Sequence, residues 1–182
     1  MRSNKIKKYQ KSTLAALLII FSSNMAFALD ASNCINHTSG VNPVTNGAVT
    51  TITTTNNIDT FQWNQFNVGS SETAFFQFTQ NGQTAVNYLD PGADASAIFG
   101  AIKGSTDFVG NVMLFNPNGI TLGTGAQITN LNSFFASTNQ FDKVSGSNIL
   151  FKEAAGTNAL NVEDVNFSNV NNAFFVAPGV IF

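Results

Sequence analysis

The feature that most constrains this fold is a tight turn placed directly after an apolar run. Residues 112–115 are Val-Met-Leu-Phe, the turn is Asn116, Pro117, Asn118 and Gly119, and Ile120 starts the next apolar run. Proline presets φ at the second turn position, asparagine tolerates bridge or left-handed backbone, and glycine takes a positive φ without steric cost. The pattern therefore predicts a sharp corner between two short strands.

The first 28 residues have the three parts of an export signal. A basic stretch precedes an apolar core at residues 14–21, and a small-residue cleavage site follows at Ala26, Phe27 and Ala28. The apolar core is too short to cross a bilayer, which takes roughly 20 residues. We expect cleavage after Ala28, which leaves a mature chain that begins at Leu29 and has the length of one domain.

Cleavage also changes the charge of the chain. Five of the eight basic residues precede Leu29, so the mature chain keeps three lysines against ten acidic residues, a formal net charge of −7. Nucleic-acid binding needs clustered Lys and Arg, so this class of function has no support. The single cysteine, Cys34, excludes an intramolecular disulfide and is expected to be a free thiol near a loosely ordered N-terminus.

The mature chain is predicted to be all-β. Short runs rich in β-branched or aromatic residues, bounded by Asn, Gly and Ser, lie at residues 50–55, 73–79, 112–115, 148–151 and 173–176. Residues 94–103 are the one candidate for a short helix. Neighbouring phenylalanines, as at 75–76, 134–135 and 174–175, should point one ring inward and one outward. The outward rings are expected to be covered by the cap or a hairpin; the alternative is an exposed apolar stripe that binds a partner.

Two architectures can use such a series of strands. Asn46-Gly47 and Asn81-Gly82 are hairpin signals, which favour a sandwich. Short apolar runs that recur through the second half, separated by Asn and Gly corners, favour a solenoid. The residues by themselves leave both architectures open.

A catalytic site is hard to assemble from this composition. The only histidine, His37, lies in a polar stretch far in sequence from any recognisable nucleophile, so we expect a plain surface residue. Asp90, Asp94 and Asp107 are the nearest approach to an acidic cluster, and the pair at 163–164 would alternate faces in a strand. We interpret these acids as solvated surface residues. No catalytic residue, metal site or cofactor is expected.

Five short motifs occur in a fixed order along the mature chain. They are Trp63-Asn64-Gln65-Phe66-Asn67-Val68, Ala85-Val86-Asn87, Ser96-Ala97-Ile98-Phe99-Gly100, Asn116-Pro117-Asn118-Gly119-Ile120 and Phe134-Phe135-Ala136-Ser137-Thr138. In this order and spacing the chain resembles the secretion domain of filamentous-haemagglutinin-type exoproteins, the haemagglutination activity domain family, exported by bacterial two-partner secretion. Tyr88 stands where that family often has arginine, a departure that counts against any recognition contact that needs a charge at this position.

The resemblance implies an all-β fold: a right-handed parallel β-helix with an N-terminal β cap and extra-helical antiparallel strands. Residues 1–28 would be the cleaved signal, 29–57 the N-terminal segment and cap, and 58–182 the β-helix domain, truncated at its C-terminus. The last residues are thus expected to be a coil of a longer solenoid.

The resemblance also implies a function. The domain would target an adhesin-type exoprotein for secretion, be recognised by the POTRA domains of an outer-membrane transporter, and start β-helix folding at the cell surface after passage through the periplasm. Host-cell glycans or receptors would be partners of the full-length protein. The residues expected to serve recognition or folding are Trp63, Phe66, Asn67, Asn87, Asn116, Pro117, Asn118, Gly119 and Ile120. The alternatives are a self-standing secreted carbohydrate-binding or adhesive protein and a β-helical polysaccharide enzyme.

Overall fold

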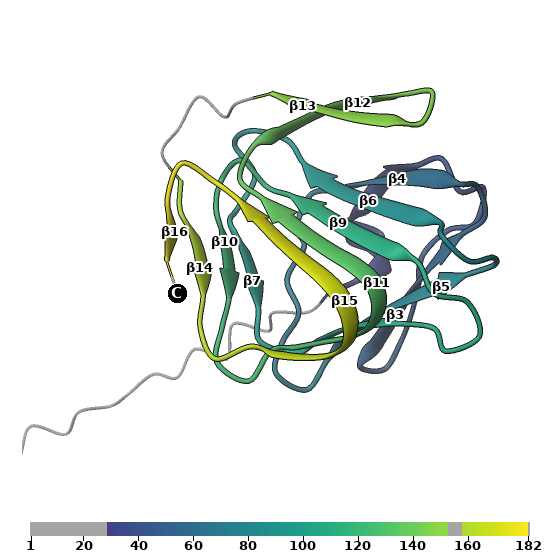
Figure 1. The fold of residues 1–182 in the computed structure, drawn as a ribbon, viewed down its shortest axis with the longest axis horizontal. Coiled ribbons are helices and arrows are strands. Elements are labelled where there is room, and N and C mark those ends of the chain that lie inside the picture. The colour runs from purple at the N-terminus through teal and green to yellow at the C-terminus, as the bar shows by residue number, and fades with distance from the viewer. Residues whose placement is uncertain (1–28, 153–157, 182) are drawn as a thin grey trace, which may run out of the picture.

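The computed structural model describes residues 29–152 and 158–181; Ala26 and Ala28 of the predicted cleavage site lie outside this range. The chain winds into a parallel β-helix with three faces (Figure 1). The first face holds β3 (Val49–Thr54), β5 (Thr73–Phe78) and β8 (Ala101–Gly104), and the second holds β4 (Ile58–Trp63), β6 (Thr84–Leu89) and β9 (Asn111–Phe115). The third face is a separate parallel sheet of β7 (Ser96–Ile98), β10 (Ile120–Leu122), β14 (Leu160–Val162) and β16 (Val180–Ile181).

Two long strands join the first and second faces into one sheet. In β11 (Gln127–Ser137), residues up to Thr129 pair with β8 and residues from Ser133 pair with β9. β15 (Asn166–Val176) pairs with β11 along its whole length. Both strands bend at an asparagine with positive φ, Asn130 at 55° and Asn169 at 54°. Asparagine tolerates this conformation better than other residues with a side chain, so each bend replaces a full corner.

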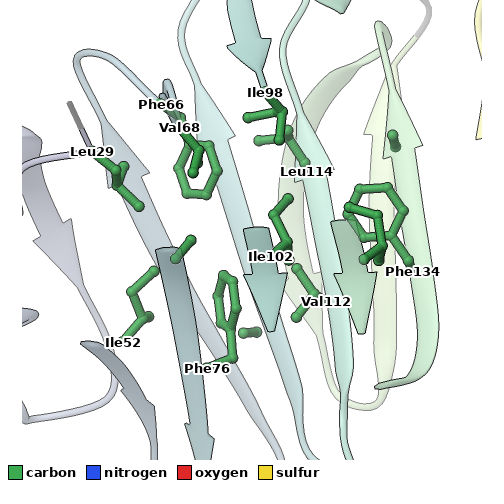
Figure 2. Packing of buried hydrophobic residues seen from close by; sticks show 14 of the residues in the cluster. Leu29, Ile52, Phe66, Val68, Phe76, Ile98, Ile102, Val112, Leu114 and Phe134 are labelled. Atoms are coloured by element: carbon green, nitrogen blue, oxygen red, sulfur yellow. The ribbon is translucent and has the colours of Figure 1, made fainter. Parts of the chain in front are cut away.

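Side chains alternate between the interior and solvent, as strands with one buried face require. In β4, for example, every second residue is buried, ending with Phe61 and Trp63. The parallel register aligns these positions in columns that run along the helix, and Figure 2 shows the packed interior formed by Ile52, Phe76 and Ile102 with their neighbours. The solenoid is therefore confirmed over the sandwich.

The expected helix at residues 94–103 is wrong. These residues form β7, a corner and β8, because Ile98 and Ile102 enter the interior from two different faces. Gly100 makes the corner possible: a Cβ there would lie 2.0 Å from the Gly69 carbonyl oxygen. Only glycine fits at such a close approach of two backbones.

Antiparallel strands occur at the N-terminal end and outside the coils. A short 3-10 helix, η1 (Ala31–Asn33), leads into β1 (Cys34–His37), which pairs with β4, and β2 (Val44–Asn46) pairs with β3. The Asn46-Gly47 hairpin is thus confirmed, with Gly47 at φ 59°. Asn81-Gly82 is instead a corner, because β5 and β6 lie on different faces and do not pair.

A second hairpin covers the outer side of the second face. It consists of β12 (Gln140–Ser145) and β13 (Asn148–Lys152), and Figure 1 shows it lying across β6 and β9. Phe141 packs on Tyr88 with ring centroids 4.5 Å apart, and Phe151 packs on Phe115 at 5.7 Å. Of the paired phenylalanines, Phe135 contacts this hairpin, with its ring centroid 6.2 Å from that of Phe151, whereas Phe174 remains 51% exposed. The expected cover is therefore present for Phe135 and absent for Phe174. Within the described residues, no helix is long and apolar enough to span a membrane.

Candidate functional site

The predicted corner at residues 116–119 forms as a tight turn. The backbone N–H of Gly119 donates to the carbonyl of Asn116 at 3.2 Å, and Gly119 has φ 118°. Asn116 is fully buried, and its Nδ2 donates to the Asp94 carbonyl and to Ser96 Oγ, both at 2.9 Å. Its Oδ1 accepts from the backbone N–H of Asn118 at 2.9 Å. One buried amide thus closes its own turn and fastens it to the preceding coil.

The other residues of the turn extend this connection to both neighbouring coils. Asn118 Nδ2 donates to the Asp90 carbonyl at 2.9 Å, and Asn118 Oδ1 accepts from the backbone N–H of Gly92 at 2.8 Å. On the opposite side, the Pro117 carbonyl accepts from Asn158 Nδ2 at 2.7 Å. Ile120 points into the interior and is 1% exposed. The turn is therefore a structural connection across three successive coils.

The first motif occupies the corresponding corner near the start of the β-helix. Trp63 ends β4 and packs edge-to-face on Phe66, with ring centroids 5.3 Å apart. Asn67 Oδ1 accepts from the backbone N–H of Ala97 at 2.7 Å, which fixes this corner to β7 of the next coil. All three residues are buried.

Asn87 joins this corner to the second face. It lies inward on β6 and is fully buried, an expensive place for an amide without partners. Its Oδ1 accepts from Trp63 Nε1 at 3.1 Å, and its Nδ2 donates to the Met113 carbonyl at 3.2 Å. The amide therefore fixes the tryptophan ring in β4 and reaches β9 on the other side.

These observations define what we call the motif edge: the edge of the β-helix at which the second face turns into the third. It contains the corners at residues 63–68, 90–95 and 116–119, one above another. The structure thus brings the predicted residues together along one line, with Asn87 just inside it. Within this set only Asn118 keeps partial exposure, so the folded edge offers solvent mainly Asn64 and the 90–95 corner.

The acidic residues do not form one cluster. Asp90 and Asp94 lie on the motif edge, whereas Asp107 lies between β8 and β9, where the first face turns into the second. Glu163 and Asp164 follow β14 and belong to no strand. Across residues 29–152 and 158–181, no group of three or more His, Cys, Asp or Glu could hold a metal ion.

His37 and Cys34 both belong to β1. His37 Nε2 lies 2.7 Å from Asn42 Oδ1, and its ring stacks on Phe61 with centroids 6.2 Å apart. Cys34 packs against the core, and burial raises the pKa of its thiol to about 11. The expected loose surroundings of Cys34 are wrong, since β1 pairs with β4, and the raised pKa disfavours the reactive thiolate.

A pocket among the described residues lies away from the motif edge. It has a volume of about 530 Å³ and opens between the hairpin tip and the β3–β4 turn. Its lining is uncharged and consists of Thr55, Asn56, Asn57, Ile58, Gln80, Val144, Gly146 and Ser147. The residues of the predicted motifs do not line it.

Asp59 was not among the predicted residues, although it is a fully buried carboxylate. Its Oδ1 accepts from Thr38 Oγ1 at 3.0 Å, and its Oδ2 accepts from the backbone N–H groups of Thr55 and Asn56 at 2.8 and 3.0 Å. Burial alone would raise the pKa of Asp59, but hydrogen bonds from Asn56, Thr55 and Thr38 hold it below its usual value. The side chain ties the cap to the first coil.

A ladder of asparagines also escaped prediction. Asn132 Nδ2 donates to Asn111 Oδ1 at 2.8 Å, and Asn171 Nδ2 donates to Asn132 Oδ1 at 3.1 Å. The steps span 21 and 39 residues, because the hairpin lies within the second interval. This uneven spacing conceals the repeat, and only the abundance of asparagine signalled it.

Comparison with known proteins agrees with this architecture. The family model described as the TPS secretion domain matches residues 28–178. Among seven matching solved chains is the HMW1 secretion domain from Haemophilus influenzae, with a TM-score of 0.56 and 21% sequence identity. The alignment covers 79% of this chain and 43% of that one, so the likeness shows a shared fold over less than half of the solved domain. No curated protein matched the sequence.

The family match spans most of the chain, and the β-helix, the cap and the extra-helical hairpin accord with it. Proteins of this kind are exoproteins exported through the outer membrane, and a transporter partner recognises their secretion domain. On these grounds the chain belongs to the TPS, or two-partner secretion, domain family.

Proposed function

We propose that this domain targets the exoprotein that carries it to the POTRA domains of an outer-membrane transporter, and that its stacking outside the membrane starts β-helix folding. The exoprotein would cross the periplasm unfolded and reach the cell surface as its coils form. The residues that form the motif edge would serve both steps: the transporter would recognise them in the unfolded chain, and they would afterwards hold the stacked coils together.

The observation that carries this proposal is the burial of the motif residues. Asn87 and Asn116 are 0% exposed and Trp63 and Phe66 are 1% exposed, so a folded domain offers none of these side chains to a partner. In an unfolded chain the same side chains are accessible. A transporter that reads them would bind the unfolded domain and lose its contacts as the coils stack.

This exchange gives export a direction without a nucleotide. Whatever binds or forms only on one side of the membrane shifts the equilibrium of the chain toward that side. Each coil contacts mainly its neighbours, so stacking can proceed coil by coil as the chain emerges. The single cysteine leaves the chain without an internal disulfide that would block threading.

Secretion through the cognate transporter tests the role of the motif edge. Asn116→Ala removes the amide that fastens two coils, and Gly119→Val forces a β-branched residue to φ 118°, at a cost of about 1 to 3 kcal/mol. Both variants should lower the amount of protein in the medium. Asn148→Ala, at an exposed asparagine on the hairpin, is the matched control and should be secreted normally. Wild-type secretion of both edge variants would contradict the role of this corner.

A second experiment separates recognition from folding. Purified POTRA domains are mixed with the domain either folded or freshly diluted from urea, and binding is measured before refolding is complete. The unfolded chain should bind, and the folded chain should not. Tight binding to the folded domain would show that the exposed groups of the edge are read instead. Secretion that persists without the transporter would favour a self-standing secreted protein.

Adhesion is a prediction about the whole exoprotein, based on the family resemblance. It is tested by expressing the full-length protein with its transporter and counting bacteria bound to host cells, with the Gly119→Val variant as the secretion-deficient control. Equal binding by both strains would assign adhesion to another protein.

A further inference from the structure

The first described residue has its backbone nitrogen beside a carboxylate. The nitrogen of Leu29 lies 3.3 Å from Glu72 Oε2. The same oxygen accepts from the backbone N–H of Gly69 at 2.8 Å. The one ion pair among the described residues joins Lys152 to Asp142, so Glu72 has no cationic side chain as a partner.

The rest of Leu29 is held as firmly as a residue inside the fold. Its side chain is 4% exposed and belongs to the core cluster, beside Ile52 and Phe66 in Figure 2. The Leu29 carbonyl accepts a hydrogen bond from Thr50 Oγ1 in β3. Two residues further on, the backbone N–H of Ala31 donates to Thr45 Oγ1 at 2.8 Å. The nitrogen of Leu29 is therefore kept at Glu72 by contacts on its other atoms.

The sequence predicts that this nitrogen changes its chemistry during export. Hydrolysis of the Ala28–Leu29 amide by signal peptidase consumes one water and leaves a carboxylate on Ala28 and an α-ammonium group on Leu29. Before hydrolysis the nitrogen is a neutral amide with one proton to donate. Afterwards it carries a positive charge and three protons, and charge-assisted hydrogen bonds are about twice as strong as neutral ones.

We propose that Glu72 is the receptor for the α-ammonium group of the mature chain, so that signal cleavage adds an ion pair where the first coil closes. The proposal rests on cleavage after Ala28 and is independent of how the transporter recognises the domain. The receptor comprises the Glu72 carboxylate, the core pocket for the Leu29 side chain, and the hydroxyls of Thr45 and Thr50. It recognises a free N-terminus followed by an apolar side chain.

The consequence is a fold that distinguishes the cut chain from its precursor. Glu72 lies just before β5 and its carboxylate also caps the turn at Gly69, so the pair connects the N-terminus to the corner that starts the second coil. In the precursor this carboxylate is left without a counter-charge. The N-terminal coil is then less stable while the signal is attached, and the precursor unfolds more readily than the mature chain.

A thermodynamic cycle tests the pair on exported protein. The chain is exported with its own signal, and a second form carries one glycine inserted between Ala28 and Leu29, which moves the ammonium away from Glu72. Each form is made with Glu72 and with Glu72→Gln, which keeps an acceptor for Gly69 but removes the charge. Mass spectrometry confirms the N-terminus, and denaturant titration measures the unfolding equilibrium.

In the form that starts at Leu29, Glu72→Gln should raise the unfolding equilibrium constant about five- to tenfold. In the glycine-extended form the same substitution should have a clearly smaller effect. Glu163→Gln, at an exposed acid that follows β14, should leave the unfolding equilibrium constant of both forms unchanged. An equal effect of Glu72→Gln in both forms would mean that the residue only caps the Gly69 turn, and a mature N-terminus other than Leu29 would also overturn the proposal.

A chemical readout complements stability. Labelling of the α-amine by a pyridinecarboxaldehyde reagent should be several-fold slower in the folded wild-type chain than in folded Glu72→Gln, because the paired amine is held and shielded. Equal labelling rates in the two folded proteins would show that the ammonium does not bind Glu72.

Discussion

The two ends of this β-helix are built from similar coils but differ in what covers them. At the N-terminal end, β1 and β2 pair with the first coil, and Ile52 and Phe61 are completely buried. At the C-terminal end, β15 pairs with β11 on one side, and every residue of β15 keeps partial exposure.

Aligned positions show what causes the difference. Ile128 and Phe167 are register partners in the same column, yet Ile128 is buried at 0% and Phe167 is 37% exposed. Both are apolar and both occupy an inward position. In a solenoid each coil is buried by its neighbours, so burial depends on whether another coil stacks above. How much an inward apolar residue stabilises this fold therefore depends on its place in the stack.

The largest expected effect is the difference in unfolding free energy between substitutions at two phenylalanines in the long strands. Phe134→Ala empties a fully buried site in β11 and should lower the free energy of unfolding by about 3 to 5 kcal/mol. Phe174→Ala, at a ring that is 51% exposed in β15, should cost about 1 kcal/mol or less. Denaturant titration of the mature chain measures both. Equal costs would break the comparison and indicate that another surface covers β15 in solution.

The next effect concerns the capped end. Asp59→Asn places an amide where several donors converge on a carboxylate and should lower the free energy of unfolding by about 1 to 3 kcal/mol at neutral pH. Because the folded-state pKa of Asp59 is depressed, its contribution is present above pH 3.8 and is lost as the pH falls through the folded pKa.

Thermal melts as a function of pH test this contribution. The difference between wild type and Asp59→Asn should shrink below pH 3.8. A difference that stays constant down to acidic pH would mean that the charge of Asp59 does not hold the cap.

A smaller loss of unfolding free energy is expected from substitutions in the asparagine ladder. Asn132 is the middle rung, with partners on both sides, so Asn132→Ala should cost about 1 to 2 kcal/mol of unfolding free energy. Asn171 is exposed and has a rung on one side only, so Asn171→Ala should cost about half as much. Equal values from denaturant titration would show that the ladder is no more important inside the stack than at its end.

The smallest effect concerns the hairpin outside the coils. Lys152 and Asp142 form an exposed ion pair at 2.7 Å, and removal of such a pair by Lys152→Ala should leave the unfolding transition unchanged. Phe141→Ala, which removes the ring packed on Tyr88 and Phe115, should loosen the hairpin and increase its amide hydrogen exchange. A larger effect from the lysine would show that charge, and not aromatic packing, attaches the hairpin.

Local features of this protein could be predicted because their causes are local. The corner at residues 116–119 follows from the backbone preferences of Pro117 and Gly119, and the Asn46-Gly47 hairpin follows from its turn. The strands near residues 50–55 and 73–79 follow from β-branched and aromatic side chains. The expected helix at 94–103 failed because nothing local reveals that Gly100 must pass close to the backbone of another coil.

In the candidate site, too, local features could be predicted from the sequence and contacts between coils could not. The sequence showed which residues belong to the motifs, but not that Asn87 and Trp63 bond to each other or that Asn116 bonds to Ser96. These partners lie one coil away, at distances along the chain that loops and the hairpin make irregular. The ladder of Asn111, Asn132 and Asn171 stayed unrecognised for this reason. Asp59 accepts hydrogen bonds from Thr55 and Asn56 nearby in the sequence, and what the sequence did not show is its burial.

By itself, the sequence determined the all-β character, the corners and, through its motifs, the secretion-domain family, and it predicts an export signal. Backbone sterics and short-range hydrophobic patterns act within a few residues, so they can be read along the chain. Only the tertiary structure decided which amides are buried, that the motif residues share one edge, and that Glu72 meets Leu29. Those properties arise when coils stack, because each coil supplies the hydrogen-bond partners and the cover that its neighbour lacks.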